Sequence, residues 1–255
     1  LVARTLGLEA AGMYAFLQQL LFIFGRYLPA NLLVNIIRPM LISRYMAGET
    51  KTVKQGMALL WKSNLLIIAA ILTVTSVAGD VLIELASSGR FTDAGMLMII
   101  MLLGLGATSQ GQLINEFMQI FLYTRQLKYF SLLSVLTPLA AFAGSGWGLL
   151  GVTSGIMLSL WLKNSLTLLW LNRQAGRIEL DWISIIRGLG LAVLLATIGW
   201  MVEREIGPWW ALVFLLIAYI PGLMLIKPLN QFDMALLNLG LRYRARFLTP
   251  FARNN

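Results

Sequence analysis

Hydrophobic residues dominate seven long runs of the chain, and short segments rich in polar residues, glycine and proline separate these runs. A helix needs about 20 apolar residues to cross the hydrocarbon core of a bilayer, and most of the runs reach or approach that length. The pattern predicts seven helices, at residues 10–45, 57–85, 94–123, 128–143, 149–171, 182–202 and 208–226. Pro29 is expected to kink or break the first, because proline removes a backbone donor. We therefore predict an all-α, polytopic transmembrane helix bundle with about seven spans.

The composition supports a membrane environment. Hydrophobic residues make up 58% of the 255 residues and charged residues only 12%, and the mean hydropathy is +0.78. A soluble domain carries about 25% charged residues, because its surface faces water. The 20 Lys and Arg exceed the 11 Asp and Glu, but basic loops at a membrane account for this excess. We expect membrane lipids as surroundings and no nucleic-acid partner.

Lysine and arginine are unevenly distributed between the two ends of the predicted helices. When the loops after the first, third and fifth helices share one side with the C-terminus, that side carries fifteen basic residues and the other only three. Basic loops mark the cytoplasmic side. We therefore predict a multi-pass protein of the bacterial inner membrane, with the N-terminus of this chain outside and its C-terminus in the cytoplasm. The fifteen are Arg44, Lys51, Lys54, Lys62, Arg125, Lys128, Lys163, Arg173, Arg177, Arg187, Lys227, Arg242, Arg244, Arg246 and Arg253, and the three are Arg4, Arg90 and Arg204.

The two ends of the chain differ from its apolar middle. Residues 228–255 are too charged to span, and their apolar residues recur at helical spacing with three arginines between them, which predicts a basic amphipathic helix on the cytoplasmic membrane surface. The chain begins at Leu1, with no charged segment, apolar core and cleavage site before its first helix, so no signal peptide is predicted. We expect it to be the C-terminal part of a longer protein.

Arg26 lies near the centre of the first predicted helix. A charge at that depth is costly, so the side chain is expected to face protein or a water-filled cavity. A guanidinium group matches phosphate with two hydrogen bonds, which makes Arg26 a candidate for holding an anionic group. The alternative is a structural ion pair, with Glu116 or with a partner outside this chain. Beyond it, a polar stripe approaches the cytoplasmic end and gives three further candidate substrate-binding residues, of which the last could instead extend to the interface: Asn31, Asn35 and Arg38.

The third predicted helix carries polar residues along one face. The stripe runs from Thr108 through Gln112, Asn115, Glu116 and Gln119 to Tyr123. Such a stripe lines a cavity or bonds to another helix. Its length favours a cavity, and Gln112 and Asn115 are candidate substrate-binding residues. Glu116 is either a proton or cation site or, slightly favoured, the ion-pair partner of Lys163 on the fifth helix.

Signatures of catalysis are missing from the chain. It contains no Cys and no His, which excludes thiol nucleophiles, imidazole bases and zinc sites of the Cys/His type. No phosphate-binding loop or nucleophile elbow occurs, and no predicted external loop exceeds about ten residues. We expect no enzyme, no cofactor and no metal. Gly151 and Gly155, continued by Ser159, form a GxxxG motif that predicts close helix packing.

Several short motifs together resemble one family. Residues 4–14 follow the pattern R-x-L-G-x-x-x-x-G-x-Y, from Arg4 to Tyr14. This resembles the opening motif of polysaccharide exporters, the oligosaccharide-lipid flippases of the multidrug/oligosaccharidyl-lipid/polysaccharide exporter superfamily. Further similarities span most of the chain: Arg38-Pro39 followed by Tyr45 and Gly48, Gly89-Arg90-Phe91 before Ala94, and the segment from Gly148 to Gly155.

The resemblance implies a fold and a function. Such flippases have about fourteen helices, in two six-helix lobes and two appended helices, and this chain resembles the last seven. Residues 1–171 would then be second-lobe helices, residues 172–227 the appended pair and residues 228–255 the tail, with the N-terminal lobe as the partner. The implied function is to move undecaprenyl-diphosphate-linked oligosaccharide to the outer leaflet by alternating access, with Arg26 holding the diphosphate. The alternatives are a drug or metabolite exporter of the same superfamily and a non-transporting scaffold of a polysaccharide assembly complex.

Overall fold

A computed structural model describes residue 4 and residues 6–32, 34–176, 178, 180–226 and 233, without the side chains of residues 34–36. Its elements are all helical, as the hydrophobic pattern predicts. The first half contains α2 (Leu8–Arg26), α3 (Pro29–Leu32), α4 (Val34–Met46), α5 (Thr50–Ala86) and α6 (Gly95–Ile120). The second half contains α7 (Thr124–Leu132), η1 (Leu133–Val135), α8 (Leu136–Gly144), η2 (Ser145–Trp147), α9 (Gly148–Gln174), α10 (Trp182–Ile206) and α11 (Pro208–Ile226).

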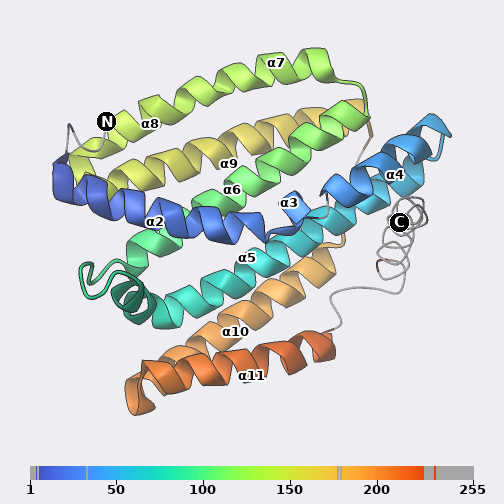
Figure 1. The fold of residues 1–255 in the computed structure, drawn as a ribbon. Coiled ribbons are helices and arrows are strands. Elements are labelled where there is room, and N and C mark those ends of the chain that lie inside the picture. The colour runs from blue at the N-terminus through green and yellow to red at the C-terminus, as the bar shows by residue number, and fades with distance from the viewer. Residues whose placement is uncertain are drawn as a thin grey trace, which may run out of the picture.

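The described residues contain six helical runs that are long and apolar enough to cross a membrane. One of them, Thr124–Gln174, has 51 residues, and a straight helix of that length would measure about 77 Å, more than twice the hydrocarbon core. This run instead folds back at Gly148, which has a φ of 70°, so that the rod formed by α7 and α8 lies against α9 (Figure 1). Its two arms, counted separately, bring the number of long helical segments in the described residues to seven. The chain is a multi-pass membrane protein.

The helices stack side by side as near-parallel rods (Figure 1). The α7–α8 rod forms one edge and the α10–α11 pair forms the other, with α9, α6 and α5 between them and α2 packed on α6. The central helices carry the core, which includes Leu60 of α5 and Phe117 of α6. The edge helices expose large apolar side chains, such as Leu139 and Ile217. This is the distribution expected where lipid, not water, surrounds the outer helices.

The first predicted helix is broken, as Pro29 leads us to expect. The α2 helix ends at Arg26, and Pro29 opens the next helical turn, where its missing N–H costs little. Side chains bind the backbone groups freed by the break: the Asn31 amide donates to the carbonyl oxygen of Gly25 at 2.7 Å, and the backbone N–H of Ala30 donates to Asn64 Oδ1 on α5 at 3.4 Å. Irregular backbone at membrane depth requires such partners.

Two glycine sites show how closely the helices approach. A Cβ atom at Gly155 would collide with the carbonyl oxygen of Ala140, and one at Gly151 with that of Gly144, so the GxxxG motif packs α9 against α8 as predicted. Gly56 of α5 instead faces the side chain of Leu41 on α4. The α5 helix begins at Thr50, earlier than residue 57, where the hydrophobic pattern begins.

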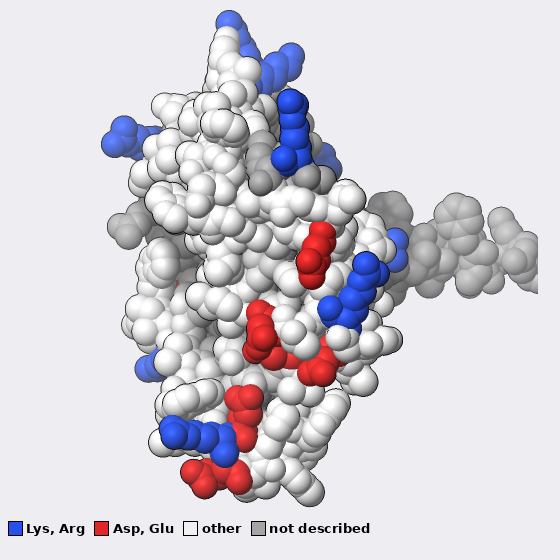
Figure 2. Space-filling model, turned by 90° about the vertical axis from the view of Figure 1, so that its left-hand side faces the viewer, with Lys and Arg blue, Asp and Glu red and all other residues white. Residues whose placement is uncertain are grey.

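The turns alternate between the two ends of the stack. The α4–α5, α6–α7 and α9–α10 connections lie at one end, and the α5–α6, α8–α9 and α10–α11 turns lie at the other (Figure 1). Figure 2 looks onto this second end, where Asp and Glu side chains gather in the middle and lower part of the view. The loop grouping used for the charge count therefore agrees with the fold. Apart from Asp233, the predicted surface helix of the tail lies outside the described residues.

Candidate functional site

A cavity of about 460 Å³ opens between α2, α6 and α9. Its size lies in the range of small-molecule sites, and apolar side chains such as Met101, Leu105 and Leu160 form most of its wall. None of its described lining residues is acidic. Its polar side chains come from these three helices and from α3, and they are Tyr14, Gln18, Arg26, Asn31, Thr108, Gln112 and Thr153.

Arg26 brings the cationic group to this cavity. It lies in the last turn of α2, directly before the helix break, where the unpaired carbonyl groups of a helix end favour a positive charge. Its guanidinium carbon lies 4.9 Å from the centre of the Phe22 ring, and the side chain is exposed. Within the described part of the chain no carboxylate forms an ion pair with Arg26. The described residues therefore provide no carboxylate that balances the charge of Arg26.

Two other predicted site residues share the cavity with Arg26. Gln112 of α6 is exposed on its wall, one helical turn beyond Thr108. Asn31 also lines the cavity, although its amide donates to Gly25 and so supports the helix break. Asn115 is partly buried and is not among the lining residues. The side chain of Asn35 lies outside the described residues.

Arg38 belongs to a second polar cluster, between α4 and α6. Its guanidinium lies 3.0 Å from a carboxylate oxygen of Glu116 and donates a hydrogen bond to Gln119 Oε1 at 2.7 Å. This corrects the predicted pairing of Glu116 with Lys163. The Lys163 ammonium donates to Ser134 Oγ at 2.9 Å, because its side chain reaches from α9 toward the α7–α8 rod, away from Glu116.

The polar residues of α6 both line the cavity and bond to neighbouring helices, the two alternatives that the sequence left open. Thr108 and Gln112 face the cavity, whereas the neighbouring Ser109 and Gln110 are buried. Ser109 Oγ accepts a hydrogen bond from Asn64 of α5 at 2.8 Å. On α9, Asn164 donates to the carbonyl oxygen of Ala107 at 2.6 Å. Such bonds hold helices together in lipid, so one face of α6 lines the cavity and the adjacent face joins α5 and α9.

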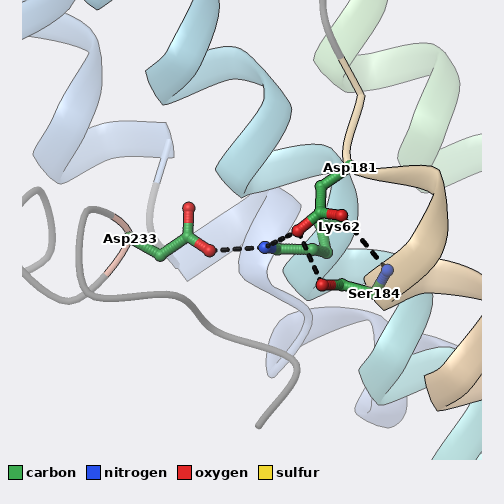
Figure 3. Close-up of polar contacts among 4 residues, drawn as sticks. All are labelled: Lys62, Asp181, Ser184 and Asp233. Carbon is green, nitrogen blue, oxygen red and sulfur yellow. Dashed lines mark hydrogen bonds and ion pairs between the residues drawn. The ribbon is translucent and has the colours of Figure 1, made fainter.

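Sequence reasoning missed a buried ion cluster around Lys62 (Figure 3). The charge count places Lys62 among the basic residues of the cytoplasmic side. Its side chain, which extends from α5, is in fact buried, with only 3% of it exposed. Its ammonium binds Asp233 and lies 3.4 Å from Asp181 Oδ2. One signal was available: Asp233 is the only acidic residue after Glu205.

Asp181 also caps α10. One of its carboxylate oxygens accepts the backbone N–H of Ser184 at 3.2 Å, and the other accepts the Ser184 hydroxyl at 2.6 Å. Burial acts to raise the pKa of the Asp181 carboxyl, but the hydrogen bonds from Ser184 and the charge of Lys62 outweigh it and hold the pKa below its usual value. The carboxylate is therefore ionised at neutral pH and serves both the helix start and the lysine.

Comparison with protein-family models, with curated proteins and with solved structures gives no match for this chain. The described residues also bring together no group of three or more His, Cys, Asp or Glu side chains that could hold a metal ion. Arg26 is the single cationic side chain among the described residues that line the cavity.

Proposed function

We propose that the chain is the C-terminal lobe, with two appended helices, of a flippase that moves undecaprenyl-diphosphate-linked oligosaccharide across the bacterial inner membrane for surface polysaccharide biosynthesis. The observation that carries the proposal is Arg26 on a cavity within the membrane-crossing helices, without a carboxylate among the described lining residues. An unbalanced guanidinium in such a site attracts an anionic group, and phosphate oxygens match its geometry.

The neutral polar side chains of the cavity suit the sugars. Tyr14, Gln18 and Gln112 offer hydroxyl and amide groups, which donate and accept hydrogen bonds without a charge of their own. A drug exporter for organic cations is disfavoured, because a cation would meet Arg26 and no acidic partner in the described wall. The motif resemblance of residues 4–14 to polysaccharide exporters supports the same choice.

Alternating access needs two lobes that rock about a shared site at mid-membrane. This chain contributes the α2, α6 and α9 wall of such a site, and we propose an N-terminal lobe as the partner that closes it. The 255-residue chain reconstituted alone is therefore expected to transport nothing. Co-expression of the partner lobe as a separate polypeptide is expected to restore export. Transport by the chain as a monomer would show that the two-lobe mechanism is wrong.

A transport assay tests the function itself. Proteoliposomes that hold both lobes are offered either a fluorescent lipid-linked oligosaccharide or a cationic dye, and movement between leaflets is followed by quenching from outside. We expect movement of the lipid-linked sugar and none of the dye. Movement of the dye alone would support a drug exporter, and movement of neither would support a scaffold.

The orientation is a second part of the proposal, and the absence of cysteine makes it easy to test. Single substitutions Thr52→Cys, Gln126→Cys and Gln174→Cys are expected to react with a membrane-impermeant thiol reagent only from the cytoplasm. Ser88→Cys and Ile206→Cys are expected to react only from outside. Labelling of positions 52 and 88 from the same side would contradict the proposed orientation.

A further inference from the structure

The α10–α11 hairpin is attached to the bundle along α5. Both of its helices pack on α5 and on each other. The start of α10 and the end of α11 lie at the same end of the stack (Figure 1). Apolar packing in lipid fixes such a pair only weakly in depth and rotation, because lipid chains compete for the same contacts.

The Lys62 cluster supplies a polar connection at this end. Asp181 directly precedes α10, and Asp233 follows α11 in the chain, so the two carboxylates that bind Lys62 flank the hairpin. Lys62 and Asp233 are almost fully buried, with 3% and 8% of their side chains exposed. One helical turn after Lys62 on α5, the carbonyl oxygen of Leu66 accepts a hydrogen bond from the Tyr219 hydroxyl of α11 at 3.4 Å.

A buried ammonium group is tolerated only where acceptors replace its water. If the start of α10 or Asp233 moved away, the buried ammonium of Lys62 would lose one of its two carboxylate partners. The cluster thus favours one arrangement of three segments of the chain. Asp181 lies 119 residues and Asp233 lies 171 residues after Lys62 in the sequence. We propose that Lys62 anchors both ends of the α10–α11 hairpin to α5, so that the hairpin and α5 move as one unit. The proposal is independent of what the cavity binds.

Cross-linking in membranes tests the anchor. Leu66 and Gly188 touch across α5 and α10 near the cluster, and Val77 and Gly199 touch farther along the same helices. The reporter pairs are Leu66→Cys/Gly188→Cys and Val77→Cys/Gly199→Cys, joined by a short thiol cross-linker. Lys62→Met removes the charge and keeps the length of the side chain. Lys51→Met, which removes an exposed lysine from the first turn of α5, is the matched control.

With Lys62→Met we expect the cross-linked fraction of the near pair to fall roughly tenfold and that of the far pair to change little. Lys51→Met should change neither. Adding Asp233→Asn to Lys62→Met should leave the near-pair cross-linking low, because the double variant still has no cation to hold the hairpin on α5. Equal loss at both pairs, or no loss at either, overturns the proposal. If Lys62→Met fails to accumulate, the same pairs are measured in Lys62→Met/Asp233→Asn. A low near-pair fraction beside an unchanged far-pair fraction supports the anchor, and a wild-type near-pair fraction overturns it.

Discussion

Two cationic side chains within the helix bundle, Arg26 and Lys62, have opposite surroundings. Arg26 is exposed on a cavity whose described lining residues include no carboxylate. Lys62 is buried and has two carboxylate partners. Both charges are costly in the membrane, and the protein balances only one of them from its described residues. A balanced charge serves the structure, whereas an unbalanced charge at a cavity is available to an anion from outside.

Because the charge of Arg26 is available to an anion, we expect Arg26→Ala to reduce transport strongly and to leave the fold intact. With the partner lobe present, movement of lipid-linked oligosaccharide should fall by roughly two orders of magnitude or more, while the protein remains inserted and abundant. Arg26→Lys should retain part of the activity, because the charge survives without the two-pronged geometry. The measurement is the leaflet-transfer assay in proteoliposomes, with immunoblots of membrane fractions.

The matched control is Arg204→Ala. Arg204 is an exposed arginine that also lies over an aromatic ring, 5.9 Å from the centre of Trp200, but it is outside the cavity lining. Its loss should leave transport unchanged. Full activity in Arg26→Ala would remove that residue from the mechanism, and loss of the protein itself would instead indicate a structural ion pair.

Lys62→Ala should have the largest effect on stability. It removes the cation that binds Asp233 in the interior, and breaking a buried ion pair costs about 3–5 kcal/mol. Arg26→Ala breaks no ion pair among the described residues and should cost less than about 1 kcal/mol. Thermal unfolding in nanodiscs measures both. Equal losses in the two variants would end the distinction between a balanced and an unbalanced cation.

The hydrophobic pattern and the polar residues within it predict much of this molecule. The bilayer requires long apolar runs, so the all-helical architecture and the break at Pro29 can be read from the sequence. Arg26 and Gln112 are each predicted to face a cavity, and the structure brings both to the same one. Ion-pair partners were harder to predict, because they depend on how each helix is rotated against its neighbours. Arg38 reaches Glu116 across the α4–α6 contact, whereas Lys163 faces the α7–α8 rod.

Lys62 illustrates a second limit. A lysine near a helix end is usually at the membrane surface, and the charge count treats it so. Its burial depends on Asp181 and Asp233, which are distant in sequence and come together only when α10 and α11 have packed on α5. No sequence pattern around Lys62 predicts these contacts.

The third cation, Arg38, should give an intermediate effect. Its side chain is 38% exposed and that of Glu116 is 23% exposed, so water weakens this pair more than it weakens the Lys62 cluster. Glu116→Gln should cost about 1–2 kcal/mol of stability. In a double-mutant cycle with Arg38→Met, the two losses should not add. Glu116→Gln with Lys163→Met should add, and coupling there would restore the pairing predicted from sequence.

The smallest effect is expected at Asp181, which joins the lysine cluster to the start of α10. Its side chain is 36% exposed, and asparagine caps helices as well as aspartate does, so Asp181→Asn should cost less than about 1 kcal/mol. Asp181→Ala loses the cap as well and should cost about 1 kcal/mol more.

The effect of pH separates the charge of Asp181 from its cap. The folded state holds the pKa of Asp181 below its ordinary value of 3.8. Its charge therefore stabilises the protein above that pH, and this contribution is lost as the pH falls through the folded pKa. The difference in unfolding midpoint between wild type and Asp181→Asn should be full at pH 7 and should shrink once the pH falls below 3.8. The Asp181→Ala variant should remain less stable than Asp181→Asn throughout, because the loss of a cap does not titrate. If the gap between wild type and Asp181→Asn stays constant down to the lowest pH at which the protein is folded, the Asp181 carboxylate contributes to α10 only as a hydrogen-bond acceptor and its attraction to Lys62 adds nothing measurable.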